Sequence, residues 1–234
     1  MNCVKNNIMK LAFAVLVFIA AFLLSLRTQA VVLDDPVYNS NAKVNKKIAL
    51  TFDDGPHPKQ TGKIADLLNL YDVKATFFVI GVNAHNYPSA LKKVIESGHE
   101  IGNHTFSHNI LKSMPRIKIE EEIFNTEKEI QNETNERSLL IRPPCGLYSD
   151  TLIEIAKDEN YKIILWTIDT HDWKHASTDS IVNNILNNIK NGDIILFHDY
   201  ISGETNTLNA LKKVIPKLKA MGYEFVTVSE LLQE

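Results

Sequence analysis

Five short polar segments in this sequence carry carboxylates, imidazoles and a guanidinium, the side chains that bind metals and transfer protons. Each ends or follows an apolar run: Asp53-Asp54-Gly55-Pro56, His104-Thr105-Phe106-Ser107-His108, Arg142-Pro143-Pro144-Cys145-Gly146, Asp169-Thr170-His171-Asp172-Trp173 and Leu196-Phe197-His198-Asp199. By itself, Asp-Asp-Gly-Pro is a common turn sequence in which carboxylates cap nearby backbone amides. His104 and His108 would share one face of a helical turn, a spacing that suits a metal ion and that also arises by chance.

Taken together, the segments supply two neutral imidazoles and a carboxylate, the ligand set of a zinc-type catalytic site that leaves one position open for water or substrate. Two adjacent carboxylates repel each other when both are ionised. A dication held by one of them offsets that repulsion, so the other can remain an anion near neutral pH. We therefore expect one of Asp53 and Asp54 to bind a divalent metal and the other to act as a base. Zinc is the expected metal, and the same ligands also accept Co, Ni or Mn.

The elements that must position these segments alternate along the chain. Strands are predicted at residues 47–52, 75–80, 100–103, 139–141, 161–168, 193–197 and 224–228. Helices are predicted at residues 59–71, 88–97, 117–131, 150–158, 178–190, 207–220 and 229–233. Apolar strands that are each followed by a helix indicate a parallel sheet covered by helices. Because the carboxyl ends of such strands meet at one edge, the polar segments should converge there.

The five segments, in this order, resemble the motifs of the polysaccharide deacetylases of carbohydrate esterase family 4, also called the NodB-homology domain. The resemblance covers residues 46–234. It implies an α/β fold, a distorted (β/α) barrel that often has seven parallel strands rather than eight, which agrees with the predicted strand number. It also implies a metal-dependent hydrolase that removes acetyl groups from N-acetylated sugars of a cell-wall polysaccharide.

The resemblance also implies roles for single residues. Asp53 matches the catalytic base of the family, and Asp54, His104 and His108 match its metal ligands. Arg142 resembles the residue that holds the base aspartate.

The remaining matched positions concern the acid and the substrate. Asp172 resembles the residue that orients and tunes a catalytic histidine, and His198 resembles that histidine. Trp173 and Leu196 match positions that wall the groove and the acetyl pocket. Cys145 departs from the family, which usually has an aromatic residue there; its main-chain N–H still serves an oxyanion, but a thiol cannot replace the aromatic surface against a sugar ring. Cys145 as a metal ligand or redox sensor, and Cys145 as a small buried thiol, are the other readings of this position.

Several acidic residues near these motifs have simpler interpretations. The run Glu120-Glu121-Glu122 is typical of a solvated helix face. Asp169 and Asp199 are expected to form hydrogen bonds with loop backbone. None of these residues receives a catalytic role from the sequence.

The N-terminal residues predict an export signal. Lys5 and Lys10 precede an uncharged apolar run at residues 11–26, and Arg27-Thr28-Gln29-Ala30 follows. Residues 1–30 are therefore expected to be a signal peptide or a signal anchor, with a membrane tether through residues 11–26 as the alternative to cleavage. Either outcome places the protein outside the cytoplasmic membrane, secreted or anchored at its outer face or in the cell wall. Residues 31–45 are polar and lack periodicity, which predicts a linker before a catalytic domain at residues 46–234.

Composition restricts the classes of function. The formal net charge is -3 and basic clusters are absent from the sequence, which argues against nucleic acid as a partner. Only two cysteines occur, and Cys3 lies in the export segment. A chain that had lost this segment could not close an internal disulfide, so its stability must come from packing.

The expected substrate is peptidoglycan, at N-acetylglucosamine or N-acetylmuramic acid. Chitin oligomers and acetylated xylan remain alternatives, because family members act on each and no motif here separates them. A non-catalytic glycan-binding module of the same fold is an alternative from a different class. A hydrolase of a small amide is a third.

Overall fold

The computed structural model describes residues 36–203 and 205–233, so the predicted export segment and residues 31–35 lie outside this part of the chain. Residues 36–234 form one compact unit. Its strands are β1 Val37–Tyr38, β2 Lys47–Asp53, β3 Thr76–Val79, β4 Glu100–Asn103, β5 Leu140–Ile141, β6 Lys162–Ile164, β7 Ile168–Asp169, β8 Ile194–His198 and β9 Glu224–Phe225. Its helices are α2 Gln60–Leu70, α3 Gly81–Asn86, α4 Pro88–Glu96, α5 Arg116–Thr134, α6 Asp150–Glu159, α7 Thr178–Asn188, α8 Thr207–Ala220 and α9 Val228–Gln233.

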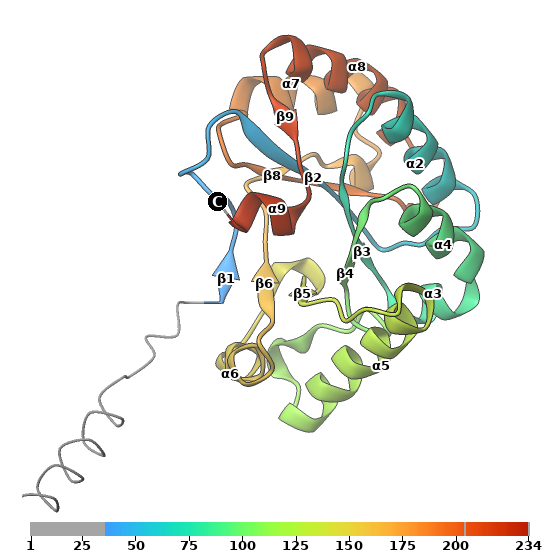
Figure 1. Ribbon diagram of the computed structural model, residues 1–234, viewed down its shortest axis with the longest axis vertical. Helices are drawn as coiled ribbons and strands as arrows, with labels where there is room; N and C mark the ends of the chain where they lie inside the picture. The colour runs from blue at the N-terminus through green and yellow to red at the C-terminus, as the bar shows by residue number, and fades with distance from the viewer. Residues whose placement is uncertain (1–35, 204, 234) are drawn as a thin grey trace, which may run out of the picture. The chain divides into compact units, whose positions relative to one another are not determined.

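The strands form one sheet in the order β1-β6-β5-β4-β3-β2-β8-β7, and β9 pairs with the first residues of β2. Every pairing between these strands is parallel. Helices surround the strands on the outside (Figure 1). This is the predicted α/β arrangement of (β/α) units. Within the described residues no ladder joins β7 to β1, so the barrel stays open along that side.

Strand β2 shows how a carboxylate reaches the inside of the barrel. Successive side chains of a strand point to opposite faces. Ile48, Leu50 and Phe52 pack with apolar residues of α2 and α8, whereas Ala49 packs with residues of β5, β6 and β8. Burying each of the three large side chains contributes about 1.5–3 kcal/mol, which holds the strand in this register. By the same alternation, Asp53 at the end of β2 faces inward.

The strand predicted at residues 161–168 is in fact two strands, β6 and β7, which raises the strand number above the predicted seven. Between them the backbone changes partners: Leu165 N donates to β1 at 2.7 Å, and Thr167 N donates to β8 at 3.0 Å. The carbonyl oxygens of Ile164 and Leu165 each accept a hydrogen bond from the guanidinium of Arg142 at 3.1 Å. The apolar pattern of the segment cannot show this break, because a distant side chain creates it.

The described part of the segment predicted to be a linker, residues 36–45, contacts the rest of the domain. Strand β1 lies in this segment and pairs with β6. Asn41 N donates to Gly192 O at 3.0 Å, and Asn41 Nδ2 donates to Leu231 O at 2.7 Å. Gly192 has a φ of 78°, and a Cβ at this residue would lie 1.9 Å from Asn41 O, so only glycine allows this approach. The segment is held by tertiary hydrogen bonds rather than by an apolar pattern of its own.

The helices lie close to their predicted positions, with one addition. Helix α3 was not predicted, and it directly precedes α4, whose first residue is Pro88. Proline at the first helical position agrees with the sequence prediction, because its missing N–H has no intrahelical partner there. In the described part of the chain, no helix combines the length and the apolar character needed to cross a membrane.

Candidate active site

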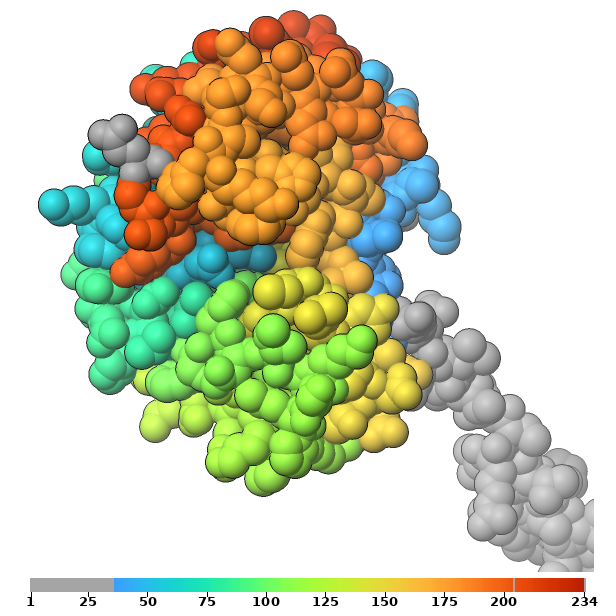
Figure 2. Space-filling model, turned by 180° about the vertical axis from the view of Figure 1, so that it is seen from behind, coloured from blue at the N-terminus to red at the C-terminus, as the bar shows by residue number. Residues whose placement is uncertain are grey.

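A cavity of about 360 Å³ opens at the carboxyl ends of the strands and gathers most of the predicted site residues. Its lining residues are Asp53, Asp54, His104, His108, Cys145, Trp166, Asp169, Trp173, Leu196 and His198. Figure 2 shows a hollow on this face between the orange segment above and the green segment below, with blue atoms at its floor. The two remaining residues, Arg142 and Asp172, are fully buried and do not line the cavity. Arg142 contacts Asp53, and Asp172 contacts His198.

Three side chains form a cradle that fits a divalent cation. Asp54 Oδ1 lies 3.4 Å from His104 Nε2 and 3.2 Å from His108 Nε2. One ligand atom from each of the three residues can be chosen so that all lie within 4.8 Å of one another. His104 Nδ1 lies 2.7 Å from Arg142 O, to which it donates, so Nε2 is the ring nitrogen that faces Asp54. Orientation of a metal-binding imidazole by a carbonyl oxygen is a common feature of metal sites.

The electrostatics of Asp54 also suit a metal ligand. Its Oδ1 atom is buried and accepts no hydrogen bond from the residues that the structure describes. A buried acceptor that faces two imidazole nitrogens is unfavourable unless a cation lies between them. Burial disfavours the ionised form of Asp54, but the neighbouring imidazoles outweigh burial and hold its pKa below the ordinary value. The carboxylate is therefore ionised at neutral pH, as a ligand must be.

The two histidines do not share a helical turn, contrary to the prediction. They lie in a loop after β4, in which Thr105 has a φ of 68° and His108 a φ of 57°. The carboxylate of Glu122 in α5 accepts hydrogen bonds from Phe106 N at 2.9 Å and Ser107 N at 2.8 Å. The loop thus bends His108 back toward His104. Glu122 was interpreted as part of a solvated helix face, and the sequence carries no signal that separates it from its acidic neighbours.

We expect Glu122→Ala to lower metal affinity by about 10- to 100-fold, because loss of a group that orients a metal ligand has effects of this size. Titration of the metal-free protein with zinc would measure the change. Glu121→Ala is the matched control, since Glu121 lies on the same helix and its carboxylate pairs with Lys118 on the surface at 2.6 Å. Equal affinity in the two variants would show that the loop keeps its geometry without Glu122.

Asp53 is held beside the cradle by a buried arginine. Arg142 Nη1 donates to Asp53 Oδ1 at 2.8 Å and to Thr51 Oγ1 at 2.7 Å. Two further N–H groups of the guanidinium donate to main-chain carbonyls at the β6–β7 break, and hydrogen bonds of this kind are what permit a buried charge. Asp53 Oδ2 lies 3.8 Å from His104 Nε2 and faces the cavity. Asp53 therefore has one carboxylate oxygen held by Arg142 and a second that faces the cavity.

His198 ends the neighbouring strand β8, where it is the register partner of Asp53, and it is fixed by a second buried carboxylate. His198 Nδ1 and Asp172 Oδ1 are 2.9 Å apart, and Asp172 Oδ2 accepts hydrogen bonds from His198 N at 3.0 Å and Thr207 Oγ1 at 2.8 Å. Burial lowers the pKa of His198, but the hydrogen bond and charge of Asp172, with smaller contributions from Asp53 and Asp54, outweigh burial and raise this pKa to about 9. A cation in the cradle would offset the contributions of Asp53 and Asp54 and leave that of Asp172. His198 is thus a protonated donor at neutral pH.

We expect Asp172→Asn to move the alkaline limb of the pH–activity profile to lower pH by about 1–3 units, the usual effect of one neighbouring charge. A donor must be protonated, so activity is present below the pKa of His198 and is lost as pH rises through it. Without the anionic partner, burial lowers that pKa. Measurement of kcat/KM against pH would show the shift, and Asp179→Asn, an exposed carboxylate paired with Lys213, is the control. An unmoved alkaline limb would mean that another group sets it.

The cavity walls include one residue, Trp166, that the sequence gave no reason to select. Trp173 and Leu196 line the cavity, together with Trp166 and Asp169. Asp169 Oδ1 accepts hydrogen bonds from His171 N at 2.8 Å, as predicted for loop backbone, and from Trp173 Nε1 at 3.3 Å. Trp166 gave no signal because it lies inside the apolar segment that splits into β6 and β7. Asp169 thus fixes one aromatic wall.

Cys145 is exposed in this cavity rather than buried. It has a φ of 58° within the 3₁₀ turn Pro144–Gly146, next to the segment that carries Arg142. The reading of Cys145 as a small buried thiol is therefore wrong. Its side chain is placed where a substrate would contact it.

Asp199, expected to form hydrogen bonds with loop backbone, also has a side-chain partner. Its side chain is buried and accepts a hydrogen bond from Thr61 Oγ1. A Cβ at Gly55 would lie 2.1 Å from Asp199 Oδ2, so the carboxyl group packs directly under the Asp53-Asp54-Gly55 turn. Burial is the main cause that raises the pKa of Asp199 to about 7. The carboxyl group supports the turn from below.

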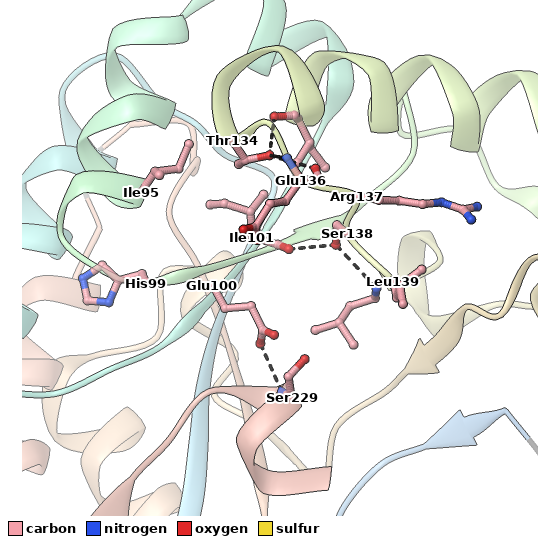
Figure 3. Close-up of a pocket in the computed structure, with 12 residues that line it drawn as sticks. Ile95, His99, Glu100, Ile101, Thr134, Glu136, Arg137, Ser138, Leu139 and Ser229 are labelled. Carbon is pink, nitrogen blue, oxygen red and sulfur yellow. Dashed lines mark hydrogen bonds between the residues drawn. The ribbon is translucent and has the colours of Figure 1, made fainter. Parts of the chain in front are cut away.

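A separate cavity of about 460 Å³ lies near the amino ends of β4 and β5. Figure 3 shows hydrogen bonds between several residues of its lining, with Glu100 accepting from Ser229 N and Ser138 donating to Ile101 O. Glu100 is the first residue of β4, whereas His104 follows the last. This cavity is therefore at the opposite end of the strands from the metal cradle.

Comparison with known proteins agrees with this site. The family model for polysaccharide deacetylase matches residues 40–164. A peptidoglycan-N-acetylglucosamine deacetylase of Bacillus cereus is 43% identical over 190 residues, which cover 80% of this chain and 89% of that protein. The crystal structure of the Bc1960 peptidoglycan N-acetylglucosamine deacetylase has a TM-score of 0.82 and 38% identity, and covers 85% of this chain and 93% of that chain.

A third similar structure differs in its chemistry. BA3943 of Bacillus anthracis, described as a CE4 family pseudoenzyme, has a TM-score of 0.80 and 30% identity, and the match covers 86% of this chain and 70% of that chain. Catalysis is thus not a property of every chain with this fold. The motifs, the parallel sheet and these similarities together show that the chain belongs to the polysaccharide deacetylase family, carbohydrate esterase family 4.

Proposed function

We propose that this protein is a zinc-dependent hydrolase that removes acetyl groups from N-acetylglucosamine units of peptidoglycan. One observation carries the proposal: a single cavity contains a cation cradle, a carboxylate fixed outside that cradle and a protonated histidine. Amide hydrolysis requires an activated water, a stabilised oxyanion and a proton for the departing amine. The cavity contains one group for each requirement.

Asp54, His104 and His108 would hold the cation, which when bound lowers the pKa of a water molecule and polarises the acetyl carbonyl. Asp53 accepts the proton of the attacking water through the carboxylate oxygen that Arg142 leaves free. The main-chain N–H of Cys145 is the additional donor that we propose for the oxyanion.

His198 completes the reaction. Its proton passes to the amine nitrogen as the C–N bond breaks, so that acetate and a free amine leave the site. Asp172 keeps the imidazole protonated and fixes its Nδ1 atom, which leaves Nε2 as the donor to substrate. Trp173, Leu196 and Cys145 are the proposed substrate contacts. No covalent intermediate with the protein is needed.

The proposed substrate follows the similar peptidoglycan deacetylases and the predicted export signal. Cell-wall glycan lies outside the cytoplasmic membrane, so we propose that the protein acts there, secreted or anchored through residues 11–26. Separating culture medium, membranes and cytoplasm and then detecting the chain in each fraction would distinguish the two forms.

The direct test is incubation of the purified full-length protein with peptidoglycan and zinc, followed by assay of acetate and free amines. We expect both products in equal amounts, and we expect the amine on N-acetylglucosamine rather than on N-acetylmuramic acid after muramidase digestion. Chitin oligomers and acetylated xylan in the same assay would identify a different preferred substrate. Metal analysis of the purified protein would test zinc against Co, Ni and Mn.

A non-catalytic glycan-binding module is the second candidate, and its support is the similarity to the pseudoenzyme BA3943. The placement of Asp53, Asp172 and His198 argues against this candidate, because binding alone requires none of their contacts. Peptidoglycan binding without acetate release, under any of the four metals, would favour it over the hydrolase.

A further inference from the structure

The proposed metal ligand Asp54 has a backbone conformation that is unusual for a residue with a side chain. Its φ is 77°, in the left-handed region that favours glycine. Residues other than glycine stay in this region only where their surroundings fix them there, and such residues cluster at functional sites. The conformation matters because it directs the carboxylate toward His104 Nε2 and His108 Nε2, at 3.4 Å and 3.2 Å. We therefore looked for the groups that hold it.

One support comes from the start of helix α3. Asn83 Nδ2 donates to Asp54 O at 2.8 Å, which fixes the peptide group that follows the Cα of Asp54. The next carbonyl is fixed from the same place, since Ile80 N donates to Gly55 O at 2.8 Å. Asn83 is half-buried, and its own N–H donates to Ile80 O at 3.0 Å. The Asn83 side chain thus links the position of α3 to the turn that carries the metal ligand.

A second support lies against the next residue of the turn. A Cβ at Gly55 would lie 2.1 Å from Asp199 Oδ2, and its three nearest atoms would all belong to the Asp199 carboxyl group. This carboxyl group accepts from Thr61 Oγ1, which itself accepts from His57 N at 2.7 Å. Asp199 N also donates to Asp53 O at 3.1 Å. Asp199 and its partner Thr61 therefore hold the turn at both of its ends.

We infer that Asn83 and Asp199 are positioning residues that hold Asp54 in its left-handed conformation and thereby set the metal affinity of the site. The inference rests on the proposed function for the identity of the metal ligands. Neither side chain lines the catalytic cavity, so both act through the turn rather than on the substrate. If either support is removed, the backbone of Asp54 can relax. The cation must then restore the conformation when it binds, which weakens its affinity.

Titration of the metal-free full-length protein with zinc tests the role of Asn83. We expect Asn83→Ala to weaken zinc binding by about 10- to 100-fold, the usual effect of losing a group that orients a metal ligand. Asn86→Ala is the matched control, because Asn86 is exposed on the same helix and lies outside the cradle. The titrations are made at a temperature at which every variant is folded. Loss of an amide with only a structural role would lower Tm and leave the Kd for zinc unchanged.

A double-mutant cycle tests the role of Asp199. Gly55→Ala places a methyl group against the carboxyl group of Asp199, so the turn must shift and zinc binding should weaken. Asp199→Ala should by itself weaken zinc binding, by about 10- to 100-fold. It also removes the atoms that the methyl group meets, so the double variant should bind zinc more tightly than Gly55→Ala alone. Asp199→Asn keeps an oxygen that can accept from Thr61 Oγ1 and should retain most of the affinity.

The zinc affinities distinguish failure of the inference from failure of the proposed function. Zinc binding by Asn83→Ala and Asp199→Ala that is as tight as that of Asn86→Ala would overturn the inference, whatever the activity. Additive effects of Gly55→Ala and Asp199→Ala would overturn the part that concerns Asp199. The expected affinities without acetate release from any glycan would support the inference and contradict the proposed function. An unsubstituted protein that binds no zinc would contradict both.

Discussion

Asp53→Asn should lower kcat for deacetylation by about 10²- to 10⁴-fold, the usual contribution of a general base. Asparagine keeps an oxygen that can accept from Arg142 Nη1, so the turn should keep its position. It cannot take a proton from water. Because Asp53 lies outside the cradle formed by Asp54, His104 and His108, the variant should bind one zinc ion as tightly as the unsubstituted protein.

The same substitution should also lower the free energy of unfolding. It leaves the buried guanidinium of Arg142 without an anionic partner, and breaking a buried ion pair costs about 3–5 kcal/mol when one partner is removed entirely. We expect a smaller loss, since one hydrogen bond remains. Asp66→Asn is the control for charge removal, because Asp66 is exposed on α2 and pairs with Lys93. Loss of zinc in Asp53→Asn would show that Asp53 is a ligand, and retained activity would show that it is not the base.

His108→Ala should remove both the metal and the activity. The side chain of His108 is 38% exposed, so its removal disturbs packing less than removal of the buried His104 would. Loss of a first ligand should weaken zinc binding by more than the roughly 10- to 100-fold that loss of an orienting group causes. Zinc content of the purified variant and acetate release from peptidoglycan would measure the two effects.

Thermal unfolding supplies a readout that does not depend on activity. A ligand that binds only the folded state stabilises it by about 2.7 kcal/mol at a concentration 100 times its Kd. Zinc should therefore raise the Tm of the unsubstituted protein and have little effect on His108→Ala. His85→Ala is the control, because His85 is exposed on α3 and lies outside the cradle. Equal zinc-dependent stabilisation of both variants would remove His108 from the proposed ligand set.

The position of the site could be predicted because its residues follow apolar strands. Parallel strands bring their carboxyl ends to one edge whatever their order in the sheet, so Asp54, His104 and His198 had to converge if the strands were correctly located. The break between β6 and β7 and the side chains that support the site from other elements could not be predicted in this way. Glu122 supports the histidine loop from α5, and Trp166 reaches the cavity at the break between β6 and β7, where Arg142 donates to main-chain carbonyls.

The sequence by itself determined the parallel α/β fold, the family and the set of chemical groups at the strand ends, because these follow from apolar runs and local motifs. The family resemblance separated the roles of Asp53 and Asp54, but only the tertiary structure gave the physical reason. The alternation of β2 turns Asp53 inward to Arg142, which is 89 positions away in the chain, while a φ of 77° directs Asp54 toward the histidines. The tertiary structure also shows that residues near Asn41 belong to the fold and that amide side chains line a second cavity beside the site. These features depend on contacts between distant segments, which local residue patterns do not encode.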